Sequence, residues 1–264
     1  MLDNLLQLPR YRGLIQSLVA RELKARYRGS VLGFFWSFVN PLLLLLVYTF
    51  VFKYVMPPAP TKEIPNLALF MFCGLLPWTW FQTSLVESSN ILISGGNLIK
   101  KVMFPAEILP IVTVLANLVH FLLGLPILIA FLVYFDAPLQ LSELAWFPVV
   151  VMVQLVLSVA LALILSALTV HFRDIKEILT NIMTLWFFAT PIIYYWKYAP
   201  ETVRRFLDLN PFTHLAISYQ EILYFPGDFG HWKWLVALGV ASSGLFLFAY
   251  FLFDRLRDSF AEEV

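Results

Sequence analysis

Few side chains in this sequence of 264 residues are suited to covalent catalysis. The single cysteine, Cys73, lies in an apolar run, so the chain can build neither a disulfide framework nor a cysteine metal site. The phosphate-binding pattern GxxxxGK[ST] is missing from the sequence, and we therefore do not expect this chain to hydrolyse ATP. Asp174 and Glu177 come nearest to a carboxylate pair for acid–base chemistry, within a cluster that also fits a solvated charged surface. We expect no catalytic residue and no metal site.

Two arginines, Arg26 and Arg28, have the chemistry that binds phosphate groups. A guanidinium group is planar, can bond two phosphate oxygens at once and stays charged at any relevant pH. Both arginines come shortly before Leu32-Gly33, where the chain turns into its first long apolar stretch. A phosphate group on a membrane-bound molecule would meet them there. Binding to anionic lipid and anchoring of the topology are alternative explanations of the same charges.

The composition is that of a membrane protein. Hydrophobic residues make up 60% of the chain and charged residues 13%, whereas soluble proteins average about 45–50% and 25%. Six stretches are apolar over about 20 residues, the length that a helix needs to cross the hydrocarbon core. We predict an all-α integral membrane protein with a single transmembrane domain over residues 1–264. Its six transmembrane helices cover about 32–54, 65–92, 106–135, 144–170, 178–196 and 233–253.

The basic residues are distributed unevenly between the two sides of the membrane. With six spans, both ends of the chain share one side with the second and fourth connections. Twelve of the 18 lysines and arginines fall on that side: Arg10, Arg12, Arg21, Lys24, Arg26, Arg28, Lys100, Lys101, Arg173, Lys176, Arg255 and Arg257. Because basic residues are enriched on the cytoplasmic side, we expect both termini in the cytoplasm. No cleavable signal peptide is expected before the first span.

Two segments outside the spans have amphipathic patterns. Residues 10–28 place their apolar side chains on one broad arc, which predicts an amphipathic helix at the membrane interface. Arg12 and Arg26 fall inside this arc, so part of it should meet protein or phosphate instead of lipid. Residues 200–225 carry two short helical patterns between prolines, which we interpret as re-entrant helices at the outer, periplasmic face. A helix resting on lipid and a peripheral surface hairpin are the respective alternatives.

Three motifs near the predicted cytoplasmic side follow one another in a characteristic order. They are Arg26-Tyr-Arg-Gly-Ser-Val-Leu-Gly-Phe-Phe-Trp36, running on to Asn40-Pro41; Asn97-Leu-Ile-Lys-Lys-Val-Met-Phe-Pro-Ala-Glu-Ile-Leu-Pro110; and Phe172-Arg-Asp-Ile-Lys-Glu-Ile178. With six spans and cytoplasmic termini, the sequence resembles the permease subunits of ABC transporters that export O-antigen, capsule or teichoic acid polysaccharides. The resemblance extends over almost the whole chain.

This resemblance implies a multi-pass protein of the bacterial inner membrane that exports polysaccharide linked to a polyprenyl diphosphate. It implies a homodimer with two copies of a separate cytoplasmic ATPase, which binds ATP and Mg, while this chain holds no cofactor of its own. Membrane lipid is an expected partner, and nucleic acid is not. The expected ATPase-coupling residues are Asn97, Leu98, Ile99, Lys100, Lys101, Phe104, Arg173, Asp174, Lys176 and Glu177. Simple anchoring of span ends by Lys100 and Lys101 is the alternative.

The predicted substrate pathway combines rings for sugars with arginines for phosphate. Aromatic residues make up 17% of the chain, and the apolar faces of sugars stack on such rings. The pathway candidates are Arg26, Arg28, Trp36, Tyr48, Trp78, Trp80, Phe81, Trp186 and Phe187. Helix packing or lipid contact explains mid-span rings equally well. The polar residues of the spans should face the bundle interior; they are Gln82, Ser84, Asn117, His120, Gln154, Asn181 and Thr184. Glu87 should form an ion pair or hydrogen bond.

An integral-membrane glycosyl- or acyltransferase acting on lipid-linked sugars is the alternative class of function. Such an enzyme would share the hydrophobicity and the aromatic residues. It would need paired Asp, Glu or His near a membrane face, and Asp174 with Glu177 is the pair that qualifies. Because both carboxylates lie inside the third motif, we favour the permease over the transferase.

Overall fold

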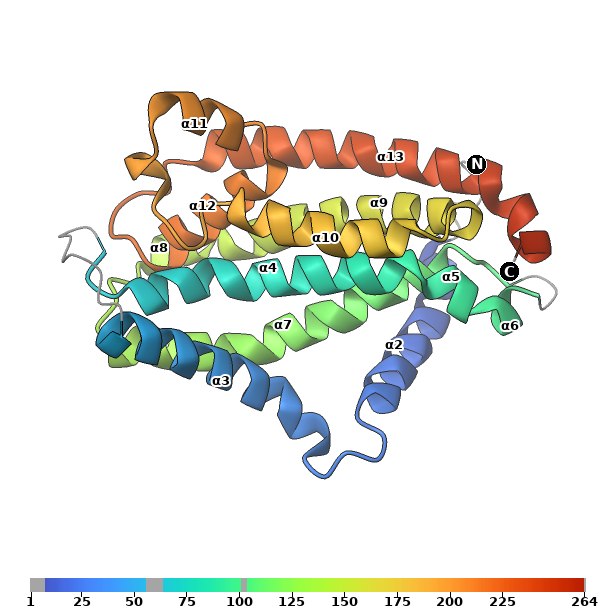
Figure 1. Cartoon of the computed structure of the whole chain (residues 1–264), viewed down its shortest axis with the longest axis horizontal. Helices are drawn as coiled ribbons and strands as arrows, with labels where there is room; N and C mark the ends of the chain where they lie inside the picture. Colours follow the sequence, from blue (N-terminus) through green and yellow to red (C-terminus); the bar gives the residue numbers. More distant parts are fainter. Residues whose placement is uncertain (1–7, 56–63, 101–103, 264) are drawn as a thin grey trace.

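A computed structural model describes residues 8–55, 64–100 and 104–263 of the chain. Within these ranges the chain forms helices joined by turns and contains no strand, as the composition predicts (Figure 1). The α-helices are α2 Arg12–Arg26, α3 Trp36–Phe50, α4 Leu67–Ser89, α5 Ile91–Ser94, α6 Gly96–Ile99, α7 Ile108–Tyr134, α8 Leu141–Leu144, α9 Phe147–His171, α10 Ile175–Phe188, α11 Glu201–Leu207, α12 Pro211–Leu223 and α13 Trp232–Glu263. A π-helical segment, η3 Val51–Val55, continues α3, and 3₁₀ turns cover Leu8–Tyr11, Gly33–Phe35 and Trp196–Tyr198.

Four helical segments in the described ranges are long and apolar enough to cross a membrane. They are Leu67–Ser89, Ile108–Tyr134, Ser142–His171 and Trp232–Arg257, with 23, 27, 30 and 26 residues. At a rise of 1.5 Å per residue, the shortest measures about 35 Å, which exceeds a hydrocarbon core of about 30 Å. These segments correspond to the second, third, fourth and sixth predicted spans. The first predicted span is helical as well, with 15 residues in α3 and five more in η3.

The fifth predicted span is shorter than its hydropathy indicates. α10 has 14 residues and ends at Phe188, whereas the apolar sequence predicts a helix to residue 196. Pro191 has no N–H to continue the helix, and the residue before a proline avoids helical backbone. Side chains bond the carbonyl groups near this break: Asn210 Nδ2 donates to Ala189 O at 3.0 Å, and Gln220 Nε2 donates to Pro191 O at 2.9 Å. Non-helical backbone is therefore stable here, because protein groups replace the missing helical bonds.

Helix α4 lies at the centre of the bundle, with α3, α7, α9, α10 and α12 packed around it (Figure 1). Close packing of α3, α4 and α7 depends on Gly124, which lies in α7. A Cβ atom at this position would lie 2.8 Å from Leu76 Cδ1 and 3.5 Å from Pro41 Cγ. Small residues at such crossings let helix backbones approach one another in a membrane, where van der Waals contact drives association.

The predicted interface helix is present as α2, and its apolar side packs on protein. Leu18 is buried against Ile108 and Val112 at the start of α7. Around them pack Tyr11, Leu14, Ile15, Val19 and Phe104. α2 therefore leans on the transmembrane bundle through the residues that the amphipathic pattern assigns to its apolar arc.

The two ends of the bundle differ in what they carry. The beginning of α2 and the end of α13 lie at the end that also holds α5, α6 and the connection between α9 and α10 (Figure 1). We call this the α6 end. α8, α11 and α12 lie toward the opposite end, which we call the α12 end. These two names are used below to say at which end of the bundle each candidate site lies.

Candidate functional site

A polar cavity of about 480 Å³ lies where α2, α3, α4 and α7 meet. Three of these helices contribute polar side chains three or four residues apart, and this spacing places them on one helix face. From α3, α4 and α7 these are Ser37 and Asn40, Thr79 and Thr83, and Asn117 and His120. Arg26, Tyr27, Ser30, Trp36, Trp80 and Phe121 complete the polar and aromatic lining. We call this space the Arg26 cavity.

Arg26 is held in the cavity by a closed network of hydrogen bonds across three helices. Its Nη2 donates to Glu87 Oε2 at 2.7 Å, and its Nη1 donates to Asn117 Oδ1 at 3.0 Å. Asn117 Nδ2 donates to the same Glu87 oxygen at 2.7 Å. The arginine and glutamate side chains are 26% and 37% exposed, so water still reaches the pair. Glu87 thus forms the ion pair that its sequence position predicts.

A second network fixes the turn that follows α2. The Tyr27 hydroxyl lies 2.7 Å from Ser37 Oγ and 3.1 Å from His120 Nδ1, and its ring meets the histidine ring edge-on at 5.6 Å. Trp36 Nε1 and the backbone N–H of Gly33 both donate to Ser30 Oγ, at 3.0 and 3.2 Å. Because these bonds join the turn to α3 and α7, they hold the mouth of the Arg26 cavity in one shape.

The structure brings three of the predicted pathway residues together in this cavity. Arg26, Trp36 and Trp80 line it, and Trp80 also stacks on Phe121 at 5.2 Å between ring centroids. Arg28 is exposed on the turn after α2 and is not part of the lining. Tyr48 lies further along α3, where it stacks in parallel on Phe52 at 6.1 Å.

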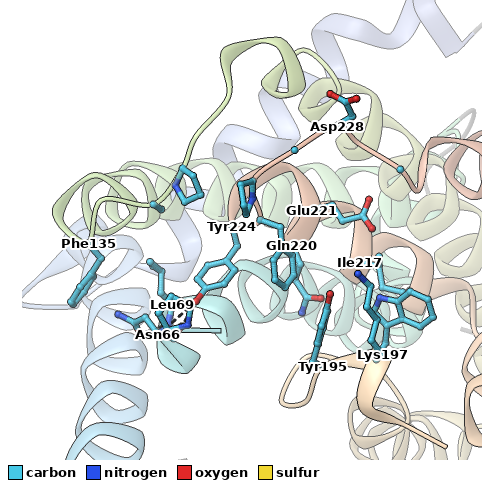
Figure 2. Close-up of a pocket in the computed structure, with 18 of the residues that line it drawn as sticks. Asn66, Leu69, Phe135, Tyr195, Lys197, Ile217, Gln220, Glu221, Tyr224 and Asp228 are labelled. Carbon is cyan, nitrogen blue, oxygen red and sulfur yellow. Dashed lines mark hydrogen bonds between the residues drawn. The ribbon is translucent and has the colours of Figure 1, made fainter. Parts of the chain in front are cut away.

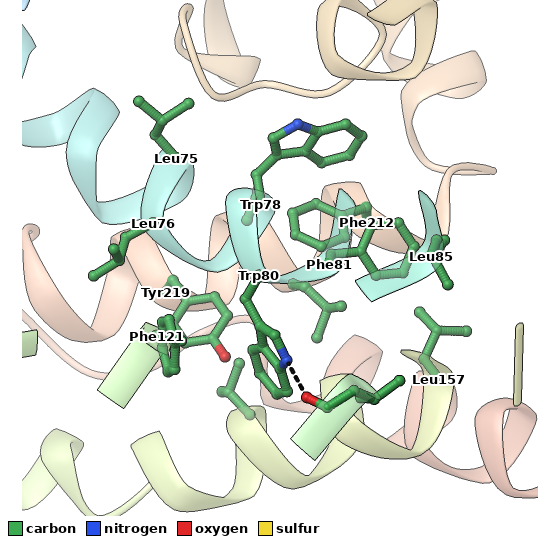
Figure 3. Packing of buried hydrophobic residues seen from close by; sticks show 14 of the residues in the cluster. Leu75, Leu76, Trp78, Trp80, Phe81, Leu85, Phe121, Leu157, Phe212 and Tyr219 are labelled. Carbon is green, nitrogen blue, oxygen red and sulfur yellow. Dashed lines mark hydrogen bonds between the residues drawn. The ribbon is translucent and has the colours of Figure 1, made fainter. Parts of the chain in front are cut away.

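The remaining predicted pathway rings form a separate cluster on another side of α4. Figure 3 shows Trp78 and Phe81 beside Phe212, with Trp80 and Phe121 on the opposite side of the helix. Trp78 and Phe212 meet edge-on at 4.9 Å, and Phe81 and Phe212 lie 4.8 Å apart. Trp186 packs against Trp78 and Phe81, and Phe187 against Trp78. Trp78 and Phe81 are fully buried in this conformation, so their rings contact protein.

The predicted coupling residues gather at the α6 end. Asn97, Leu98 and Ile99 belong to α6, and Lys100, which follows directly, is exposed. Arg173, Asp174, Lys176 and Glu177 are exposed at the connection between α9 and α10. Phe104 is half-buried against the cluster of Leu18, Ile108 and Val112, and Lys101 lies outside the described residues. The exposed charges and the beginning of α2 therefore share one end of the molecule.

Comparison with known proteins identifies the architecture. Residues 13–224 match the profile of the ABC-2 type transporter family, which is most of the chain. The chain belongs to the ABC-2 type transporter family. It is 43% identical over 261 residues to the O-antigen export system permease protein RfbA of Myxococcus xanthus, covering 98% of both chains. It is 32% identical to RfbA of Klebsiella pneumoniae over 94% of both chains. Its identity to the polysialic acid transport protein KpsM of Escherichia coli is 22%, over 76% of this chain and 78% of that protein.

ABC-2 membership decides between the two classes of function. The similar proteins are permeases and transport proteins, so the chain is the membrane subunit of a transporter and not a membrane-bound transferase. An ABC transporter draws its energy from an ATPase, and a separate subunit must supply it because the phosphate-binding pattern is missing here. Asp174 and Glu177, the pair that an enzyme would need, are exposed at the α6 end of this ABC-2 chain.

Several cavity residues of the ABC-2 chain are not among the predicted site residues. Ser37, Asn40, Thr79 and Thr83 are small polar residues in apolar surroundings, each paired with another at three or four positions along its helix. That spacing was a usable signal, because polar side chains inside a span turn away from lipid. The motif around Arg26 identifies the part of the lining that comes from α2 and the following turn. The spacing of the small polar residues identifies the parts that come from α3 and α4.

Proposed function

We propose that the chain is the transmembrane subunit of an ATP-driven ABC exporter that moves polysaccharide linked to a polyprenyl diphosphate across a bacterial inner membrane. The similarity to O-antigen export permeases over 98% of the chain is the observation that carries this proposal. Two copies of the chain work with two copies of the ATPase, which binds ATP and Mg. The exported material is an O-antigen-like glycan, in keeping with the names of the similar permeases.

The proposed topology has six spans, with α3–η3 as the first and α10 as the fifth. α3 and η3 together are long enough for the hydrocarbon core, at about 30 Å. α10 reaches about 21 Å, and the buried non-helical segment after it completes the crossing inside protein. The α6 end, with both termini, then faces the cytoplasm. α11 and α12 are re-entrant helices at the periplasmic face.

The Arg26 cavity is the proposed site for the diphosphate headgroup. It lies between the interface helix and the first span, where a lipid arriving sideways from the inner leaflet would reach it. Arg26 offers a planar fork of donors, and Arg28 adds a second exposed guanidinium group at the same turn. The aromatic pathway residue Trp36 is half-buried beside this fork and offers a surface for the first sugar. Trp80 is buried against Phe121 in this conformation and supports the wall behind it.

The α6 end is the proposed contact surface for the ATPase. Lys100 and the charged residues at 173–177 offer a cluster of exposed charges for such a partner. Lys101 follows Lys100 in the sequence and adds a second positive charge. Phe104 connects this surface to α2 because it packs on the apolar cluster of Leu18, Ile108 and Val112, to which α2 contributes Leu18. A movement of the ATPase against α6 would thus reach the helix that carries Arg26.

Complementation in cells tests the proposal. A strain lacking the gene should keep its lipid-linked glycan inside the cytoplasmic membrane and lose surface polysaccharide, and the wild-type gene should restore export. The double variant Arg26→Lys with Arg28→Lys keeps both charges but loses both forks, so it should insert and assemble normally and export less glycan. Arg21→Lys, on the exposed side of the same helix, is the matched control.

Two results would contradict these assignments separately. Unchanged surface polysaccharide in the deletion strain would exclude glycan export as the function of the chain. Full export by the double lysine variant would show that charge alone matters at these positions, and would remove both arginines from the headgroup site.

A further inference from the structure

A second cavity, of about 750 Å³, lies at the α12 end, and the proposed headgroup and ATPase sites do not use it (Figure 2). It lies between the beginning of α4, the end of α7, residues 195–197, α12 and residues 225–230. α12 contributes Ile217, Gln220, Glu221 and Tyr224, whose spacing of three and four residues places them on one helix face. The volume falls within the range of about 300–1,000 Å³ that is typical of small-molecule sites. We call this space the outer cavity.

The walls of the outer cavity are tied together by hydrogen bonds. The Tyr224 hydroxyl accepts a hydrogen bond from Asn66 N at 3.0 Å and donates one to Asn66 O at 3.1 Å. These two bonds fix the end of α12 to the start of α4. Glu221 Oε2 accepts from the backbone N–H of His231 at 3.0 Å, which fixes the segment before α13. Gln220 donates to Pro191 O, which fixes the segment after α10. The cavity is therefore formed in advance of any ligand, which lowers the entropic cost of binding.

The lining has the groups that recognise sugars. Tyr195 and Trp196 supply rings, and Lys197 Nζ lies 5.5 Å from the Tyr195 ring centroid. Figure 2 shows Glu221 and Gln220 of α12 near Tyr195 and Lys197. A carboxylate offers about four lone-pair positions, so the bond from His231 leaves Glu221 able to accept from hydroxyl groups. Rings for the apolar face of a sugar and oxygens for its hydroxyls thus meet in one space.

The charges of the lining exclude the diphosphate and favour a neutral ligand. Three carboxylates, those of Asp136, Glu221 and Asp228, face one ammonium group, that of Lys197. This excess of negative charge repels phosphate and leaves acceptors for the hydroxyls of an uncharged molecule. A divalent cation is not the ligand either, because no three His, Cys, Asp or Glu side chains of the described residues converge on one point.

We propose that the outer cavity binds a neutral saccharide unit of the transported glycan after it has crossed the membrane. This inference rests on the proposed export of a glycan and adds a second binding site to it. A glycan held at the α12 end cannot slide back while the subunits reset. Glu221 supplies the charged acceptor, and the ring of Trp196 supplies the stacking surface.

Binding of lipid-free glycan to the purified complex tests the proposal. The full-length chain with its ATPase is placed in nanodiscs and titrated with polysaccharide that mild acid has released from the producing cells, which removes lipid and diphosphate. Wild-type protein should bind this glycan, and Glu221→Gln should raise its Kd about tenfold, because a hydrogen bond to a charged acceptor is replaced by a neutral one. Glu201→Gln is the control, since Glu201 is an exposed carboxylate that pairs with Arg205 at 2.9 Å on α11, away from the cavity lining.

Each outcome decides the proposal. A rise in Kd in Glu221→Gln without one in Glu201→Gln supports the outer cavity, and a similar rise in Trp196→Leu supports its aromatic wall. Equal Kd values in wild type and Glu221→Gln, no binding of the glycan at all, or displacement of the glycan by inorganic pyrophosphate would each overturn it. Export of glycan by the same proteins in cells is measured in parallel, so that failure of this site is distinguished from failure of the transport function.

Discussion

Replacing Glu87 by glutamine should make the transporter more sensitive to its lipid-linked substrate. In this conformation Glu87 Oε2 accepts two hydrogen bonds of 2.7 Å, one from Arg26 and one from Asn117. A diphosphate that binds the Arg26 fork must first displace this carboxylate. Glutamine retains the acceptor for Asn117 and removes the charge that holds the guanidinium group, so the arginine becomes easier to recruit.

The size of the effect follows from the geometry and exposure of the pair. A hydrogen bond between charged groups contributes about 1.5–3 kcal/mol when shielded from water, and a fully exposed ion pair about 0.2–1 kcal/mol. Arg26 and Glu87 are 26% and 37% exposed, which places their interaction near the boundary of these ranges, at about 1 kcal/mol. The half-saturating concentration of substrate should therefore fall about fivefold in Glu87→Gln.

The assay is substrate-stimulated ATP hydrolysis by the complex in nanodiscs, with lipid-linked glycan as the titrant. Glu22→Gln is the control, because Glu22 lines the neighbouring cavity and its removal changes the local charge by the same amount. A half-saturating concentration that is unchanged or higher in Glu87→Gln would refute competition for Arg26. A lower value in both variants would show that charge near the cavity, and not the Arg26 pair, controls binding.

Three further predictions concern other parts of the chain. The purified chain should not hydrolyse ATP without its partner, and steady hydrolysis after removal of contaminants would contradict the assignment as a permease. Lys100→Glu with Lys101→Glu should abolish copurification of the ATPase and leave insertion intact, whereas lost insertion would favour the anchoring role. Burial, and secondly the neighbouring His214, lower the pKa of His231 from 6.5 to about 4. In the unfolded chain His231 is protonated below about pH 6.5, whereas in the folded chain it is protonated only near pH 4. The free energy of unfolding should therefore fall as the pH is lowered from about 6.5 to about 4. Thermal denaturation at pH 7.5 and at pH 5 measures this effect. Lowering the pH should reduce the melting temperature less in His231→Asn than in the wild-type protein.

The helices could be predicted from hydropathy because lipid requires apolar side chains and internally bonded backbone together. The same rule explains the failure at α10, which ends at Phe188. Hydropathy indicates whether the side chains of a segment are in apolar surroundings, but not whether its backbone is helical. The residues between α10 and position 196 are largely apolar because they pack against protein. Pro191 is the visible local signal for the break. The side chains of Asn210 and Gln220 that stabilise it come from a distant part of the chain, so the sequence does not identify them in advance.

The two ring environments around α4 could be separated from spacing alone, whereas the Arg26 network could not. Trp78 and Trp80 are two residues apart on a helix with 3.6 residues per turn, so they lie about 200° apart around its axis. One ring therefore faces α12 and the other α7. Arg26 and Asn117, by contrast, are 91 residues apart, and their contact depends on how α2 leans on α7. The amphipathic pattern predicts an apolar arc on α2, but it does not choose between lipid and protein as the partner.

The packing of α2 gives a physical route between the two ends of the proposed mechanism. Phe104 follows the predicted coupling helix and packs on the apolar cluster that Leu18 of α2 forms with Ile108 and Val112 of α7. Arg26 lies eight positions further along α2, about 12 Å at helical rise, and bonds Glu87 of α4 and Asn117 of α7. α2 is thus held at one point by an apolar contact near the proposed ATPase surface and at another by the network that a diphosphate bound at the proposed site would break. A rigid helix held at two points transmits a shift at either one to the other, provided that the apolar contact and the polar network each have a second arrangement. In the proposed mechanism, the exchange of Glu87 for phosphate would supply that second arrangement at the cavity, and the seating of the ATPase would supply it at α6.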